Sequence, residues 1–299
     1  MKDPLTILAT TKNYNSGDES SAFRIIQIYQ KLKQEKTLSA EEVELLLREA
    51  LTLKKTPEKE IESLLFSQHI SLFCFPYAGG SASFYKNWSS ELPHAIKVVG
   101  MEYPGRGEKE NETLLKVFDV LLSHLEKEIL SKIKGPFAFF GHSLGAIIAF
   151  ELARLLQDKH GLQPAALFLS GCPSPDIISL FSSMNEMKDE SFIQSLEDLN
   201  GTPQGLMELA EFREFFLPIL RADFSLLDSY VPAQMRVKFP LVIFGGKQDP
   251  KVNIEDLSKW SFWTESSMSL IKLEGDHFFI RQPKLVLNVI AENLCPKLF

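Results

Sequence analysis

The stretch that decides the fold is FAFFGHSLGAIIAFELARLLQDK at residues 137–159. Its first four residues form a short apolar run rich in aromatic side chains, which predicts a buried β-strand. From Leu144 onward the residues are mostly strong helix formers, which predicts a helix. Between them lies GHSLG (141–145), and a glycine-flanked serine between strand and helix predicts a nucleophile elbow. Glycines are needed there because the turn is too tight for neighbouring Cβ atoms.

Further apolar runs of the same kind lie on either side of this elbow. They are nearly continuous in hydrophobicity, as expected of parallel strands that are covered on both faces, and helical patterns separate most of them. The sequence therefore predicts an α/β fold, with a mostly parallel sheet flanked by helices. The expected strands are 70–75, 96–101, 137–140, 166–170, 241–245 and 269–273.

The long interval between the fourth and fifth expected strands breaks this alternation. From about 175 to 236 no strand pattern appears, and the helical stretches lie around 189–199, 205–217 and 218–230. We interpret this interval as a helical lid inserted into the α/β domain.

Residues 1–69 also differ from the rest of the chain. They hold 21 charged residues, whereas the remaining 230 positions hold 50. A tail-like start is followed by two or three amphipathic helical patterns, one of them opened by a capping box of Ser39 and Glu42. We expect a helical extension at 1–69 and an α/β domain at 70–299.

Composition excludes several classes of protein. The chain has 299 residues, 44% of them hydrophobic, and a net charge of −7. No run approaches the roughly 20 apolar residues of a membrane helix, so we expect a cytoplasmic protein without membrane contact. The 32 basic and 39 acidic residues give no nucleic-acid footprint. Cys74, Cys172 and Cys295 have the spacing of neither a disulfide framework nor a metal site.

A serine in this type of elbow needs a general base later in the chain, and elimination selects it. In an α/β-hydrolase the order is Ser, then Asp or Glu, then His. Only His160 and His277 follow Ser143 usefully. His160 lies at the end of the helix after the elbow, where a cation is favoured. His277 follows the last expected strand, at the carboxyl edge where Ser143 also lies. We predict His277 as the base.

The acid that orients His277 is predicted to be Asp249, which directly follows the expected strand 241–245. Asp176 is its rival, because some hydrolases carry this acid after the preceding strand. That strand ends at Ser170, however, so Asp176 lies several residues too far along. Asp276 adjoins the histidine and Asp256 falls in a following helix, so neither is favoured.

An oxyanion hole needs two backbone N–H groups that point at the developing negative charge. One is expected from Leu144, directly after the nucleophile. The other is expected from FPYAGGS (75–81), where glycines permit close backbone approach, and Ala78 is the donor that we predict.

Taken together, six separated motifs resemble the type II thioesterases that accompany polyketide and non-ribosomal peptide synthases. The resemblance covers residues 70–298, some three quarters of the chain, and the joint pattern is far more specific than the serine motif alone. The motifs are FCFPYAGGSAS (73–83), YPGRG (103–107), GHSLGA (141–146), FLPILRADFSLLDSY (216–230), GGKQDP (245–250) and GDHFF (275–279).

The resemblance implies an α/β-hydrolase core, a helical lid that includes 216–230, and hydrolysis of acyl groups from the phosphopantetheine arm of carrier proteins. The family's catalytic positions match Ser143, Asp249 and His277, and its oxyanion donors match Ala78 and Leu144. A carrier protein is then the expected partner and a monomer the expected state. No metal or other cofactor is expected.

Substrate-binding residues are less well defined by the sequence. Tyr77 lies in the oxyanion loop, and Phe216 and Phe224 belong to the lid; the two phenylalanines either line an acyl channel or anchor the lid on the core. Arg106 either meets a substrate phosphate or carboxylate or forms a structural ion pair, and we favour the ion pair. Residues 1–69 depart from the family pattern, and both a docking role and simple packing on the core stay open.

Four functions compete on this basis. We favour an editing thioesterase that removes aberrant or stalled acyl groups from a synthase. A chain-terminating thioesterase for medium-chain acyl carriers keeps the chemistry but changes the task. A general carboxylesterase is the third reading. A non-catalytic partner of a synthase is the fourth, and the intact set of Ser143, Asp249 and His277 argues against it.

Overall fold

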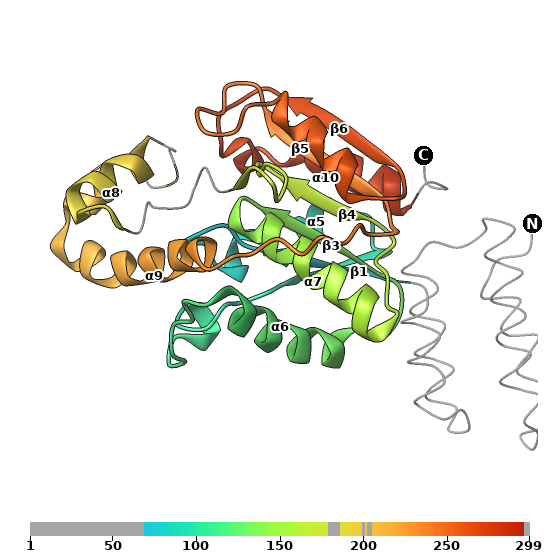
Figure 1. Cartoon of the computed structure of the whole chain (residues 1–299), viewed down its shortest axis with the longest axis horizontal. Coiled ribbons are helices and arrows are strands. Elements are labelled where there is room, and N and C mark those ends of the chain that lie inside the picture. Colours follow the sequence, from blue (N-terminus) through green and yellow to red (C-terminus); the bar gives the residue numbers. More distant parts are fainter. Residues whose placement is uncertain (1–68, 179–185, 199–200, 202–204, 296–299) are drawn as a thin grey trace, which may run out of the picture. The chain divides into compact units, whose positions relative to one another are not determined.

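In the computed structural model of the chain, residues 69–178, 186–198, 201 and 205–295 are described. Their centre is a six-stranded sheet in the order β2-β1-β3-β4-β5-β6, and every neighbouring pair is parallel. Figure 1 shows these strands as arrows. The strands are β1 Ile70–Phe75, β2 Ile96–Gly100, β3 Phe137–His142, β4 Leu167–Ser170, β5 Leu241–Gly246 and β6 Met268–Leu273. The six predicted strands are confirmed to within two residues at either end.

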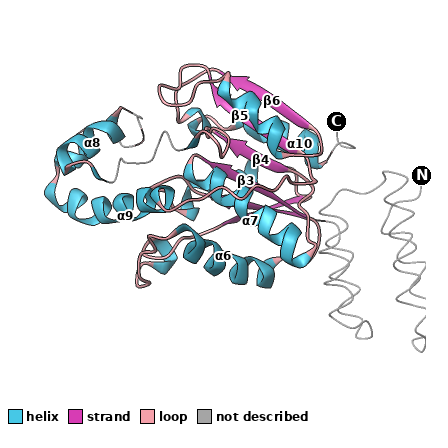
Figure 2. Cartoon of the chain, in the orientation of Figure 1, coloured by secondary structure: helices cyan, strands magenta, loops and turns pink. Residues whose placement is uncertain are grey.

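Helices fill most of the connections between strands and surround the sheet in Figure 2. The α-helices are α5 Trp88–Glu91, α6 Phe118–Lys132, α7 Leu144–His160, α8 Asp189–Glu197, α9 Ala210–Asp228 and α10 Lys284–Leu294. Short 3₁₀ helices are η1 Ala82–Tyr85, η2 Gly107–Lys109, η5 Leu206–Glu208, η6 Asp256–Trp263 and η7 Phe279–Arg281. In the described part of the chain, no helix is long and apolar enough to cross a membrane.

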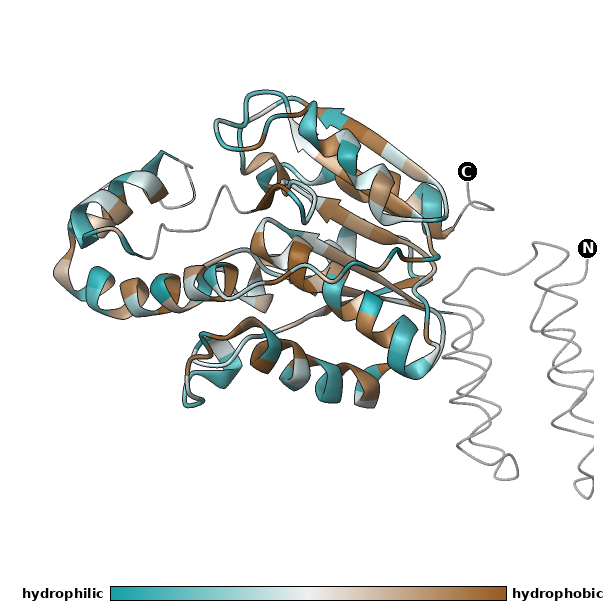
Figure 3. Cartoon of the chain, in the orientation of Figure 1, coloured by the Kyte–Doolittle hydropathy of each residue, from teal (hydrophilic) through white to brown (hydrophobic). Residues whose placement is uncertain are grey.

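The inner strands β1, β3, β4 and β5 are buried on both faces, with successive residues pointing to opposite sides, whereas the edge strands β2 and β6 are partly exposed. Phe73 and Phe139 belong to the core that includes α6 and α7. Leu72 and Phe140 belong to the core that includes α5 and α10. This two-sided burial explains why the strands read as continuous apolar runs. Figure 3 shows hydrophobic colour along the inner strand β4 and alternating hydrophobic and hydrophilic colour along the helices.

The β4–β5 connection departs from the prediction in one respect. Two helices were expected around 205–217 and 218–230, but residues 210–228 form the single helix α9, with Pro218 in its interior. A proline normally ends or kinks a helix. The apolar face of α9 continues past Pro218 through the buried residues Ile219 and Leu220, and this burial outweighs the one lost backbone hydrogen bond.

The predicted extension at 1–69 lies outside the described residues, apart from His69. Within the interval 175–236, the described residues contain helices and no strand. Figure 1 shows α8 and α9 beyond the end of the sheet toward which the strand arrows point. The residues that follow the strands therefore face the same region as these two helices.

Candidate active site

Ser143 occupies the turn between β3 and α7 with a strained backbone. Its φ of 54° and ψ of −120° make it the sole non-glycine residue with positive φ among the described residues. The turn is crowded on both sides. A Cβ on Gly141 would lie 2.7 Å from Ala146 Cα, and one on Gly145 would lie 2.6 Å from the Pro76 carbonyl oxygen. Only glycines fit there, and the compact turn exposes the Ser143 hydroxyl at the start of α7.

His277 lies in the loop after β6 and contacts Ser143 directly. Its Nε2 is 3.1 Å from Ser143 Oγ, and its Nδ1 is 2.7 Å from Asp249 Oδ2. The side chains of His277 and Asp249 are 2% and 1% exposed, so water hardly competes for this contact. The structure thus brings the three predicted residues, which come from three different strand ends, into one hydrogen-bonded row.

The Asp249 carboxylate is fixed by its own loop. Its second oxygen, Oδ1, accepts hydrogen bonds from the backbone N–H groups of Lys251 and Val252, at 2.9 and 3.0 Å. These bonds leave Oδ2 aimed at the imidazole. A carboxylate held in this way favours the tautomer of His277 in which Nδ1 carries the proton, so that Nε2 is free to accept one.

The rival residues are engaged elsewhere. Trp263 Nε1 donates to Asp176 Oδ1 at 2.9 Å. Asp276 Oδ1 accepts from the Phe278 N–H at 2.9 Å and caps its own loop. His160 lies in the last turn of α7, and its Nε2 is 2.8 Å from Glu126 Oε1. Asp256 opens η6 and pairs with Lys259.

The two predicted oxyanion donors, Leu144 and Ala78, lie in different elements. Leu144 is the first residue of α7, so helix geometry gives its N–H no acceptor within the helix. Ala78 belongs to the loop after β1, which approaches the start of α7 closely enough that Gly145 has no room for a Cβ beside Phe75 and Pro76. Leu144 directly follows Ser143, and the close approach of the Ala78 loop to the start of α7 is compatible with the predicted role of both amides.

His142 packs against His277 and so contributes to this site, a role that the sequence did not suggest. Its side chain is fully buried, with Nδ1 2.9 Å from Ser170 Oγ and the ring 5.1 Å from that of His277. Burial, with a smaller contribution from His277, lowers the pKa of His142 well below its ordinary value. His142 is therefore neutral at physiological pH and adds no charge beside His277.

The predicted substrate-binding residues have different environments. Tyr77 is partly buried and packs edge-on against Phe278 at 4.9 Å, next to His277. Phe216 is partly exposed on α9 and stacks on Phe212 at 4.2 Å. Phe224 is 4% exposed and packs against Phe192 of α8 at 5.3 Å. Of the two readings, anchoring describes Phe224, whereas Phe216 packs against the core and stays partly exposed.

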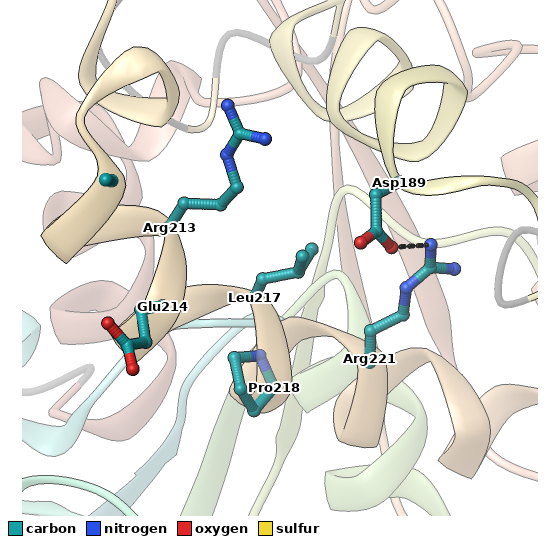
Figure 4. A pocket seen from close by; sticks show the side chains of 7 residues that line it. Asp189, Arg213, Glu214, Leu217, Pro218 and Arg221 are labelled. Carbon is teal, nitrogen blue, oxygen red and sulfur yellow. Dashed lines mark hydrogen bonds and ion pairs between the residues drawn. The ribbon is translucent and has the colours of Figure 1, made fainter.

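A hollow of about 560 Å³ lies between α8 and α9 (Figure 4). Its two arginines are already engaged: Arg221 pairs with Asp189 at 2.7 Å, and Arg213 donates to the Met207 carbonyl at 3.2 Å. The lining includes none of the residues around Ser143, so the hollow is separate from the hydrogen-bonded row. Its full lining is Asp189, Ala210, Arg213, Glu214, Leu217, Pro218 and Arg221.

Arg106 forms the structural ion pair that the sequence analysis favoured. Its guanidinium makes a bidentate contact with Asp223 of α9, with both distances at 2.6 Å. The two residues are 117 positions apart. No local pattern relates them, although each lies in one of the motifs quoted above.

Comparison with known proteins settles the family. Residues 70–295 match the thioesterase domain family. The chain belongs to this family. Family membership indicates a thioester hydrolase. Among the described residues, no group of histidine, cysteine, aspartate or glutamate has the arrangement of a metal site.

Two curated relatives and one solved structure illustrate the similarity. The gramicidin S biosynthesis protein GrsT of Aneurinibacillus migulanus is 39% identical over 77% of this chain and 89% of its own length. The medium-chain S-acyl fatty acid synthase thioesterase of Rattus norvegicus is 28% identical over 82% of this chain and 97% of its own. The type II thioesterase BorB from the borrelidin biosynthetic cluster superposes with a TM-score of 0.69 at 31% identity, over 76% of this chain and 93% of its own.

Proposed function

We propose that this thioesterase hydrolyses acyl groups from the phosphopantetheine arms of carrier proteins, and that it edits a polyketide or non-ribosomal peptide synthase by removing aberrant or stalled acyl groups. The observation that carries the proposal is the row Asp249–His277–Ser143 within a chain of the thioesterase family. The similarity to BorB, a type II thioesterase from a biosynthetic cluster, supports the biosynthetic setting. One copy of the chain supplies all three residues, which fits the expected monomer.

In the acylation step, His277 Nε2 accepts the proton of Ser143 Oγ as that oxygen attacks the thioester carbonyl carbon. The carbonyl oxygen becomes an oxyanion that accepts hydrogen bonds from the Ala78 and Leu144 N–H groups. Asp249 stabilises the imidazolium. When the tetrahedral intermediate collapses, the C–S bond breaks and the acyl group stays on Ser143.

The leaving group suits this site. A thiol with a pKa of about 8.5 departs as thiolate more readily than an alkoxide, so cleavage depends less on a proton from His277. The thiolate takes up that proton afterwards. Water then enters, His277 accepts one of its protons, and the resulting hydroxide attacks the ester carbon. Collapse breaks the bond to Ser143 Oγ, which regains a proton from His277, and the carboxylic acid is released. These steps use groups of this chain and the substrate thiol, so they need no cofactor.

We further propose that the interval of about 175–236 acts as the lid of this site. Its helices α8 and α9 lie beyond the carboxyl edge of the sheet, where Ser143, Asp249 and His277 also lie (Figure 1). The partly exposed ring of Phe216 on α9 and the ring of Tyr77 next to His277 are the candidates for contact with the acyl chain.

A second candidate function is the release of a finished medium-chain acyl product. The observation in its favour is the similarity to the medium-chain fatty acid synthase thioesterase over most of both chains. The chemistry is the same, and the two tasks differ in acyl-length preference.

The test is intact mass spectrometry of carrier proteins loaded with acetyl, medium-chain or aminoacyl groups, each incubated with wild type and with Ser143→Ala. We expect broad, slow loss of short acyl groups that Ser143→Ala abolishes. Fast removal confined to one long chain would favour product release instead. Turnover of simple esters without deacylation of any carrier would contradict the proposal and leave a general carboxylesterase.

A further inference from the structure

Asp223 of α9 reaches into the loop that carries Ala78. Its carboxylate is 1% exposed and accepts hydrogen bonds from two sources. Arg106 donates to both of its oxygens, and the backbone N–H of Gly79 donates to Oδ2 at 2.7 Å. The bond to Gly79 spans 144 positions of sequence and ties α9 directly to the residue after Ala78.

A second contact from α9 falls on the same glycine. Gly79 has a φ of +75°, and a Cβ there would lie 2.7 Å from Leu220 Cδ2. Arg106 Nη1 also lies 3.4 Å from the Gly80 carbonyl oxygen, and Tyr103 OH donates to the Pro76 carbonyl at 3.0 Å. The loop after β1 is thus held between α9 and the segment after β2.

These contacts restrict the direction in which the Ala78 N–H can point. Peptide units are planar, so the loop can turn only about φ and ψ. The Gly79 N–H belongs to the unit after the Ala78 Cα, and the Ala78 N–H belongs to the unit before it. When Asp223 fixes the first of these units, it restricts the rotation that would swing the second away from Ser143.

We propose that Asp223, itself held by Arg106, is a positioning residue that aims the Ala78 N–H into the oxyanion hole. Because Asp223 belongs to α9, the geometry of the oxyanion hole then depends on the position of this helix. The inference rests on the proposed function, in which Ala78 donates to the oxyanion. Asp223 touches no reacting atom and acts through the loop.

Two changes test this inference at different levels of disruption. Asp223→Asn keeps the shape of the side chain but takes from the buried Arg106 the carboxylate that it contacts at 2.6 Å, which destabilises the fold. The double variant Arg106→Met with Asp223→Leu removes both charges. Replacing a buried ion pair by apolar residues of similar volume is often neutral for stability, so this variant separates folding from positioning.

The expected result is a loss of kcat in the double variant, whereas Asp223→Asn keeps an amide oxygen that can accept from the Gly79 N–H and should lose less. Removal of a whole oxyanion donor costs about 10²–10³ in kcat, and we expect a misaimed Ala78 N–H to cost about 10–100-fold. We expect the double variant to keep the melting temperature of the wild type and still show this loss, because a leucine side chain at position 223 offers the Gly79 N–H no acceptor.

Two acyl-pantetheine analogues give the decisive readout. A trifluoromethyl ketone adds to Ser143 and places an oxyanion in the hole, whereas an unreactive amide reports ground-state binding. We expect ketone affinity to fall with kcat and amide affinity to change less than about twofold. Tyr230→Phe is the matched control. Tyr230 is buried just after α9, and this change removes its 2.7 Å hydrogen bond to Glu151. It leaves the loop after β1 unchanged. It should lower stability and keep both affinities.

A double variant with wild-type kcat would overturn the positioning role. So would an equal fall in both affinities, which would mean that Asp223 shapes ground-state binding. Failure of the proposed function looks different. If the wild type cleaves p-nitrophenyl esters but no carrier thioester, that function is wrong, and the same variants measured on the ester still decide the role of Asp223. A wild type that forms no adduct at Ser143 would overturn both.

Discussion

Trp263 donates its indole N–H to Asp176 at 2.9 Å, so the carboxylate that rivals Asp249 is bonded to a tryptophan. This contact makes the two acids separable by experiment. Asp249→Asn should lower kcat by about 10⁴, because an amide cannot hold His277 in the tautomer with a free Nε2. Asp176→Asn should keep kcat close to wild type. Steady-state kinetics on an acyl-pantetheine thioester checks both. A large loss in the Asp176 variant would reverse the assignment.

The crowding around Gly145 predicts that adding a single methyl group there lowers the stability of the fold strongly. In Gly145→Ala the new Cβ would overlap the Phe75 carbonyl and lie 2.6 Å from the Pro76 carbonyl oxygen, and both are backbone atoms that shift only with the strand. We expect a loss of more than about 4 kcal/mol in the free energy of unfolding, together with the activity. Urea unfolding monitored by circular dichroism measures it.

Gly161→Ala is the control for this change. Gly161 ends α7 with a φ of +64°, but a Cβ there has nothing within 4 Å. The variant therefore has a strained backbone but no overlap of its Cβ with other atoms. Its free energy of unfolding should fall by about 1 kcal/mol, and its activity should be unchanged. Equal losses in the two variants would contradict the crowding argument.

His142 predicts a pH dependence of stability. Burial lowers the pKa of His142 in the folded chain, whereas an unfolded histidine titrates near 6.5. The unfolded state therefore binds more protons in acid. This contribution to stability is fully present above about pH 6.5 and is lost as the pH falls below it, by up to about 1.4 kcal/mol per pH unit.

His142→Asn keeps a group near Nδ1 that can bond Ser170 and removes the titration. Urea unfolding between about pH 8 and pH 5 should show a flatter slope for this variant than for the wild type, whatever its absolute stability. Identical slopes in the two proteins would show that His142 titrates normally in the folded state.

Two phenylalanines of the β4–β5 connection should respond in opposite ways. Phe224 is buried against Phe192, so Phe224→Ala should cost about 3–5 kcal/mol of stability. Phe216 is partly exposed, so Phe216→Ala should cost about 1 kcal/mol. Contact between the Phe216 ring and the acyl chain predicts that this variant raises the ratio of the octanoyl-thioester KM to the acetyl-thioester KM by about 3–10-fold. An unchanged ratio would remove Phe216 from the substrate path.

The sequence predicted what depends on local patterns. The strands were recognisable because a sheet buried on both faces needs continuous apolar runs, and GHSLG marks its own turn. The break expected before Pro218 was wrong. Proline's local preference was outweighed by the buried face of α9, and no local rule weighs tertiary burial against propensity.

The order of residues along the chain gave the row of Asp249, His277 and Ser143, because strand ends of a parallel sheet meet at one edge. The contact between Asp223 and Gly79 had no such rule behind it. It depends on how α9 returns across the edge of the sheet. That path is decided by packing between segments 144 positions apart, which periodicity and composition do not encode.

The position of β6 also has a consequence for synthesis of the chain. Among the described residues β6 is an edge strand that pairs with β5 alone, and the loop after it supplies His277, which bonds Ser143 across 134 positions. A ribosome makes Ser143 long before His277. Most of the sheet can assemble on the nascent chain before His277, the proposed base, has been made. The proposed active site is therefore incomplete until the loop after the last strand of the sheet has been made, and Ser143 stays chemically silent until then.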